Sequence, residues 1–151
     1  MIGREGERTI SRIATRMAFS EPRVGCGAAI VASGRILLLL RRTEPEAGCW
    51  GLPGGKVDLF EPAAQACERE IAEELGIAIV ADTLLCHADH IDKALGIHWV
   101  APIYLITTFT GAPRLMEPEK HDGLDWFSLD ALPESLTAPT RVAVEALGRL
   151  R

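Results

Sequence analysis

The sequence predicts a single α+β domain, and three observations carry that prediction. With 151 residues, of which 48% are hydrophobic, the chain is long enough to bury one sizeable core. Apolar runs of strand length, such as Ile36–Leu40, recur along the chain, and none reaches the ~18–20 residues of a membrane-spanning helix. Helical spacing occurs at residues 62–75 and 139–150.

Charge and cysteine spacing narrow the class of protein. The formal net charge is −5, so the chain lacks the basic character of proteins that bind the DNA or RNA backbone. The cysteines form no CxxC pair and no zinc-like spacing with the histidines. They are Cys26, Cys49, Cys67 and Cys86. We therefore expect reduced thiols, a cytoplasmic location, and neither a membrane nor a nucleic-acid polymer as partner.

Residues 1–20 are set apart as an extension of a domain that spans residues 21–151. Four arginines recur there at four-residue spacing: Arg4, Arg8, Arg12 and Arg16. This spacing would line one side of a helix. Such a segment can be a transit peptide, but Glu5 and Glu7 favour a docked or frayed helical extension, or a translation start at Met17.

A β-hairpin is predicted at the start of the domain. Its strands are the mostly apolar residues 24–32 and residues 35–42, joined by a Ser-Gly turn. Arg41 and Arg42 end the second strand, near the loop that leads to an acidic segment. Each arginine either is a surface residue or grips a phosphate group through its bidentate guanidinium.

A helix is predicted at residues 62–75, after a loop that ends in Pro53-Gly54-Gly55. Proline is preorganised for the first helical position, the segment is rich in Ala, Glu and Leu, and Gly76 stands where a left-handed C-cap would form. At about 100° per residue, one arc of the helix is apolar and another is acidic. The apolar arc holds Ala64, Cys67, Ile71 and Leu75, and the acidic arc holds Glu70, Glu73 and Glu74.

The acidic arc is unusual for a merely solvated helix face. Like charges three or four residues apart destabilise an isolated helix by roughly 0.2–0.5 kcal/mol per pair, and Arg69 is the arginine that lies among them. A hard divalent cation such as Mg²⁺ would reverse this repulsion, because it prefers carboxylate oxygens and is often shared with substrate phosphates. The segment therefore predicts a metal site.

The rest of the chain is predicted to form strands and loops before a closing helix. Apolar residues within 77–91 and at 98–110 are expected to pair as an antiparallel hairpin, with residues 88–96 as its loop or tip. His87 and His90 are three residues apart, so on a strand they point to opposite faces and share no metal. A loop, a short strand and an amphipathic helix follow at residues 111–124, 124–127 and 139–150.

The spacing around the predicted helix resembles the Nudix box, GX5EX7REUXEEXGU, in which U is aliphatic. Every fixed position matches, from Gly55 through Glu61 to the segment Arg69–Ile77. The resemblance covers roughly residues 24–135 and implies the Nudix fold, a mixed β-sheet sandwiched between α-helices in which the box forms loop, helix and loop. It also implies hydrolysis of a nucleoside diphosphate linked to another moiety, with Mg²⁺ or its substitute Mn²⁺.

The same resemblance implies roles for particular residues. Metal ligands are expected at Gly55, Glu61, Glu70, Glu73 and Glu74. Either Glu73 or Glu74 is instead the base that deprotonates water, and Arg69 is expected to position a box glutamate by ion pairing.

Residues outside the box are expected to contact the substrate. In the segment EPEK, Glu119 is a better candidate than Glu117 for a further catalytic residue, the alternative being a solvated loop. Lys120 and Trp126 are expected to line the base pocket. Trp50 either closes the core or stacks on the base, and selectivity is expected from these segments and residues 91–98.

Substrate class is predicted by exclusion. The proline that marks the ADP-ribose branch is replaced by Asp92 and Lys93, and the markers of the diadenosine polyphosphate and NADH branches are missing. This favours the MutT-like branch, which cleaves a (deoxy)nucleoside triphosphate to monophosphate and pyrophosphate. The alternatives are an ADP-ribose or nucleotide-sugar pyrophosphatase and a non-enzymatic nucleotide sensor. The preferred base, the use of oxidised nucleotides and a homodimeric state stay open.

Overall fold

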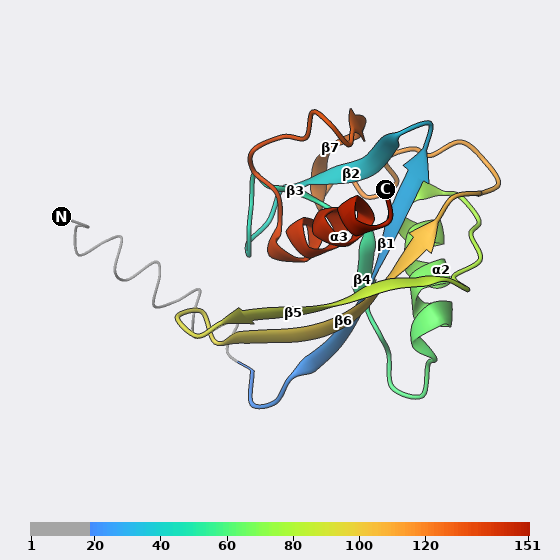
Figure 1. Ribbon diagram of the computed structural model, residues 1–151. Helices are drawn as coiled ribbons and strands as arrows, with labels where there is room; N and C mark the ends of the chain where they lie inside the picture. Colours follow the sequence, from blue (N-terminus) through green and yellow to red (C-terminus); the bar gives the residue numbers. More distant parts are fainter. Residues whose placement is uncertain (1–18) are drawn as a thin grey trace.

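A mixed β-sheet with helices on both faces forms the computed structural model, which describes residues 19–151 (Figure 1). Its elements are β1 (Arg23–Ala32), β2 (Arg35–Arg41), β3 (Trp50–Gly51), β4 (Gly54–Lys56), α2 (Ala63–Leu75), β5 (Leu84–Asp92), β6 (Ile97–Ile106), β7 (His121–Ser128) and α3 (Ala138–Arg149). The α+β prediction is confirmed. The helix expected in residues 1–20 lies, but for its last two residues, outside the described part of the chain.

Strand β1 organises the sheet. It runs parallel to β6 and antiparallel to β4, and its last residues form a hairpin with β2. Strands β3 and β7 pair with β2, and β5 pairs with β6. Within the described residues no helix is long and apolar enough to cross a membrane.

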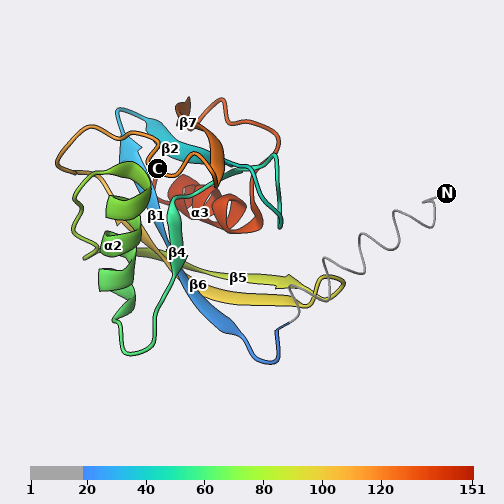
Figure 2. The same ribbon diagram turned by 180° about the vertical axis from the view of Figure 1, so that it is seen from behind.

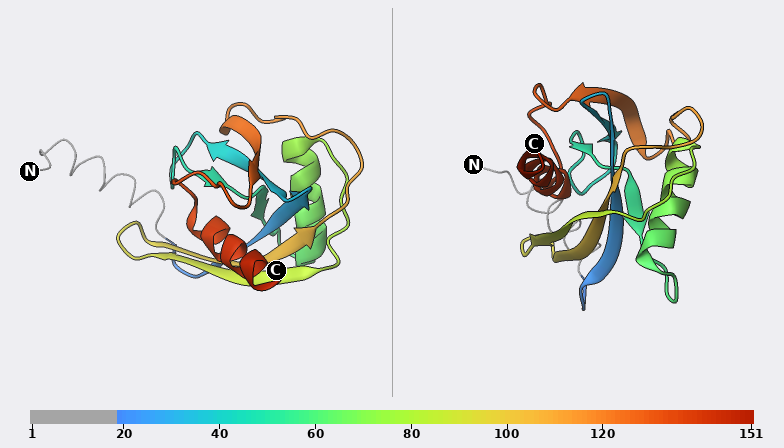
Figure 3. Two further views of the ribbon diagram at one scale, coloured as in Figure 1. Left: turned by 45° about the horizontal axis from the view of Figure 1, so that its top comes forward. Right: turned by 45° about the vertical axis from the view of Figure 1, so that its right-hand side comes forward.

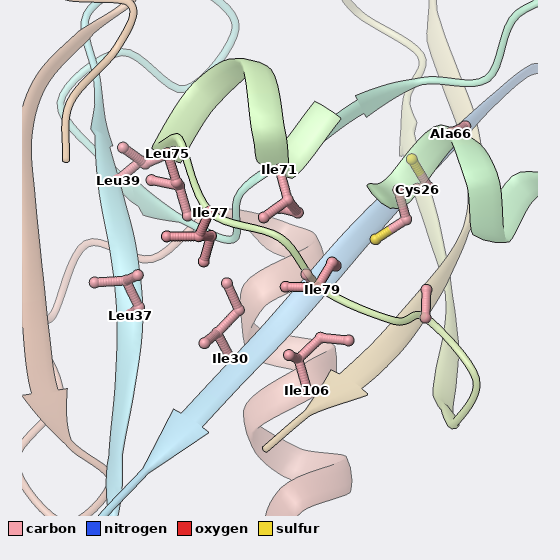
Figure 4. Packing of buried hydrophobic residues seen from close by; sticks show 13 residues of the cluster. Cys26, Ile30, Leu37, Leu39, Ala66, Ile71, Leu75, Ile77, Ile79 and Ile106 are labelled. Carbon is pink, nitrogen blue, oxygen red and sulfur yellow. The ribbon is translucent and has the colours of Figure 1, made fainter. Parts of the chain in front are cut away.

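Helices α2 and α3 cover opposite faces of the strands (Figure 3). Alternation along β1 sends Ala28 and Ile30 into the core beneath α2 and Ala29 into the core beneath α3. Figure 4 shows the first of these cores, where Ile71 and Leu75 are fully buried. Each such side chain contributes about 1.5–3 kcal/mol of burial energy, so the apolar arc fixes which side of α2 faces the sheet.

Helix α2 ends as the sequence predicts and begins one residue later. Pro62, predicted as the first helical residue, is the extended N-cap, and Gly76 closes the helix in the left-handed conformation, with φ of 67°. The expected acidic arc is split, because Glu74 is buried on the core side whereas Glu73 is turned toward solvent.

The hairpin of β5 and β6 is paired closer to its tip than predicted, although β6 ends earlier, at Ile106, and its strands project together away from α2 (Figures 1 and 2). The expected loop at residues 88–96 is right for the turn at residues 93–96 and wrong for residues 88–92, because pairing continues from Ala88 opposite Ala101 to Asp92 opposite Ile97. Polar side chains suggested a loop there, but backbone pairing tolerates them on exposed strand faces. Strand β7 likewise starts earlier, at His121, because β2 pairs along its length.

One buried hydroxyl ties α3 to the segment that precedes β4. Thr140 is fully buried, and its Oγ1 accepts a hydrogen bond from the Leu52 amide at 2.9 Å and pairs with the Thr137 hydroxyl at 2.7 Å. The bond holds residues 50–53 against the helix.

We expect the substitution Thr140→Val to lower the free energy of unfolding by about 1–3 kcal/mol, because the Leu52 amide would lose its acceptor. Urea denaturation measures this change. Thr107→Val, at an exposed position, is the control and should change stability by less than about 0.5 kcal/mol. Equal stability of the two variants would show that the buried hydroxyl contributes little.

Candidate active site

An open pocket of about 500 Å³ is lined by residues of α2, of several strands and of the segment that begins α3. Its walls come from β1, β4, β5 and β6, the two glutamates of α2, the loop after β2, the loop before β7, and the start of α3. The lining residues used below are Gly25, Arg41, Gly54, Gly55, Lys56, Glu70, Glu74, His90, Trp99, Ala101, Glu117, Lys120 and His121.

Two glycines bring the sheet close to the box helix. Gly54 has φ of 153°, and a Cβ there would collide with the backbone carbonyl of Cys26 on β1. A Cβ at Gly55 would overlap the carboxylate of Glu70. A side chain at position 54 would therefore displace the backbone of β1, and a side chain at position 55 would displace the Glu70 carboxylate.

Arg69 is the centre of an ion-pair network on α2. Its guanidinium lies 2.8 Å from Glu61, 2.9 Å from Glu70 and 3.3 Å from Glu73. It also lies 3.5 Å from Asp58. The hydrogen bonds from Arg69 hold the pKa of Glu61 at about 2, so this carboxylate stays ionised. One cation thus offsets several carboxylates that would otherwise repel one another.

Glu74 is the deeply buried acid of the site, with a side chain only 5% exposed. Its Oε1 accepts a hydrogen bond from the Gly54 amide at 3.1 Å, and its Oε2 lies 3.7 Å from His121 Nε2. Burial raises its pKa to about 8, with smaller upward contributions from Glu70 and Glu117. Because burial disfavours the charged carboxylate, a proton on Glu74 or a cation beside it would stabilise the side chain in this position.

The loop before β7 brings a further acid to the pocket, and this acid is Glu117. Glu117 pairs with Lys120 at 2.7 Å through Oε2, whereas its buried Oε1 has no hydrogen-bond partner in the described protein. His121 Nδ1 is also buried without a partner. Glu119, the residue favoured from sequence, is exposed and does not line the pocket.

The predicted substrate-binding residues divide into two groups. Arg41 and Lys120 line the pocket. Arg42 is exposed and lies 3.7 Å from Asp122, outside the pocket lining. Trp50 packs edge-to-face on Phe127, and Trp126 stacks on Phe109, so both rings are used in packing and neither lines the pocket.

Sequence reasoning missed His121, His90 and Trp99 as pocket residues. The tertiary structure assembles them from strands far apart in the chain, so no local motif marks them. Only the predicted importance of residues 91–98 pointed toward the right hairpin.

Comparison with known proteins identifies the family. The NUDIX domain model matches residues 21–147. The chain belongs to the Nudix family. A crystal structure of a MutT NUDIX hydrolase from Burkholderia pseudomallei covers 85% of this chain and 99% of its own, with a TM-score of 0.83 and 62% identity. This Nudix protein is therefore a pyrophosphohydrolase that acts on a nucleotide-linked phosphoanhydride.

Two relatives are named for activities on different substrates. The CTP pyrophosphohydrolase of Escherichia coli is 33% identical over 129 residues, which are 82% of this chain and 90% of the relative. The ADP-ribose pyrophosphatase of Methanocaldococcus jannaschii is 28% identical over 116 residues, which are 77% of this chain and 68% of the relative.

The residues present fit the divalent cation that Nudix hydrolases generally need. Carboxylate and carbonyl oxygens suit a hard cation, and the buried Glu74, the partnerless Glu117 Oε1 and the Gly55 carbonyl supply such donors at one pocket. Among residues 19–151 no three acidic, His or Cys side chains already converge on one point. Arg69 holds several of the carboxylates instead.

We expect Arg69→Lys to lower hydrolysis of a nucleotide substrate by about 10–100-fold, because a lysine ammonium cannot bridge Glu61 and Glu70 with the planar fork of arginine. Steady-state kinetics measure the effect. Arg149→Lys, which alters an exposed pair with Glu145, is the matched control and should leave the rate unchanged. Full activity of the Arg69 variant would show that the network does not position the glutamates.

Proposed function

We propose that this Nudix hydrolase cleaves a nucleoside triphosphate to a monophosphate and pyrophosphate. The observation that carries the proposal is the distribution of charge in the pocket, where Glu70, Glu74 and Glu117 face a site also lined by Arg41 and Lys120. The two cations can hold phosphate oxygens that lie beyond the reach of a metal ion. The E. coli relative is a CTP pyrophosphohydrolase, which supports this substrate class.

Mg²⁺ is the proposed cofactor, with Mn²⁺ as its substitute. The Gly55 carbonyl and Glu70 would hold it, and Glu117 Oε1 is a further oxygen donor. The cation would neutralise phosphate charge and make a coordinated water easier to deprotonate. Glu61 and Glu73 stay predicted ligands, although both are paired with Arg69 here.

Glu74 is the proposed proton acceptor. The Gly54 amide fixes its Oε1, so Oε2 is the oxygen that can take a proton from the attacking water. Burial raises the pKa of Glu74 to about 8, so a cation beside this carboxylate would be needed to keep it ionised at neutral pH and able to accept a proton. His121 Nε2 lies 3.7 Å from Oε2.

We expect Glu74→Gln to lower kcat for nucleoside triphosphates by about 10²–10⁴-fold while nucleotide binding is retained. The assay follows pyrophosphate and nucleoside monophosphate in the presence of Mg²⁺, with EDTA as the metal-free control. Glu134→Gln, at an exposed position, should keep full activity. Unchanged turnover by the Glu74 variant would remove this residue from the mechanism. AMP and ribose 5-phosphate formed from ADP-ribose, without cleavage of triphosphates, would overturn the proposed substrate.

A second comparison separates the two acids of the EPEK segment. We expect Glu117→Gln to lower kcat/KM by about 10–100-fold, because its buried carboxylate lines the pocket, and Glu119→Gln to have little effect. Paired kinetics at several Mg²⁺ concentrations measure both. Loss of activity in the Glu119 variant alone would favour the original prediction and would mean that this loop rearranges when substrate binds.

A further inference from the structure

One aromatic residue of the pocket lining, Trp99, has no part in the proposed hydrolysis. Trp99 on β6 lies directly opposite His90 on β5, and both residues line the pocket. Gly25 and Ala101 occupy the next row of the same sheet face, and the indole of Trp99 lies beside Gly25. Glu70 and Glu74 of α2 line the same pocket.

Trp99 is held in one orientation by its neighbours. A Cβ at position 25 would lie 3.4 Å from Trp99 Cε3, so glycine there lets the indole lie against β1. Phe19 contacts the indole edge-to-face, with ring centroids 5.5 Å apart. Arg23 covers Phe19 at 3.7 Å, and the Phe19 amide donates to the Gly96 carbonyl at 2.9 Å. A braced ring loses little conformational entropy when a ligand binds.

Strand register places this ring at a suitable distance from the catalytic end. Gly55 pairs with Cys26, and the parallel register of β1 and β6 puts Cys26 beside Pro102. A Cβ at Gly25 would lie 3.3 Å from the Gly55 carbonyl oxygen and 3.4 Å from Trp99 Cε3, so the edge of the indole lies near the carbonyl that is the proposed metal ligand. A nucleotide whose phosphates lie near this carbonyl can therefore place its base beside Trp99.

We propose that the base of the nucleotide substrate stacks on Trp99. This inference rests on the proposed function and assigns the base-binding subsite to the β5–β6 hairpin. All three tryptophans of the chain lie in the described part, and Trp99 is the one that lines the pocket. Stacking on an indole face tolerates every base, because each base has a π surface. The subsite thus supplies affinity, and base choice depends on polar neighbours such as His90.

Kinetics with a nucleoside triphosphate test the proposal. Trp99→Leu removes the aromatic face and should raise KM by about 5–150-fold with little change in kcat, because a stacked base contributes that much to binding. Trp99→Phe keeps an aromatic ring and should retain most of the affinity. Leu84→Ala, at an exposed position at the start of β5 and outside the pocket lining, is the control and should match the parent protein. Equal KM values for the leucine variant and the parent would overturn the proposal.

Tryptophan fluorescence gives an independent readout. Nucleoside monophosphate should quench the emission of the parent protein, ribose 5-phosphate should not, and Trp99→Phe should abolish the quenching. Quenching that persists in this variant would place the base elsewhere. If the parent protein cleaves a different nucleotide-linked compound and no triphosphate, the proposed function fails, but the KM comparison with that compound still decides the role of Trp99.

Discussion

The close approach of Gly54 and Gly55 to β1 and α2 is the constraint on which the site depends. Gly54 lies against the Cys26 carbonyl and Gly55 against the Glu70 carboxylate, and no other residue type leaves this space. The approach allows the Gly54 amide to hold Glu74. Backbone and helix then present oxygen atoms to the same pocket, as a cation requires.

Electrostatic compensation follows from that packing. Bringing carboxylates together against a sheet raises the pKa of the buried Glu74 and of the partly buried Glu70, mainly through desolvation. Arg69 offsets part of this cost by contacting Glu61, Glu70 and Glu73. Glu74 has no arginine partner among the described contacts, so its pKa stays raised.

The pocket combines residues proposed for hydrolysis with residues proposed for recognition of the base. Glu70, Glu74, Gly54 and Gly55 line it from α2 and β4, and α2 is held by packing in the core beneath it (Figure 4). Trp99 and His90 line it from the hairpin of β5 and β6, which projects away from α2 (Figure 2). Side chains on such a hairpin can change with little effect on the core, so recognition of the base can vary while the hydrolytic residues stay in place.

The sequence by itself determined the fold class, the family, the end of α2 and most of the residues that bury it, because these follow from local spacing and hydrophobic periodicity. Tertiary structure decided the rest. Local periodicity grouped Glu73 with Glu74, but packing buried one and exposed the other. The choice between Glu117 and Glu119 depended on the path of a loop, which has no periodicity. Trp99 reached the pocket, and Trp50 and Trp126 did not, because strand register and the pairing of distant strands set which face each ring occupies.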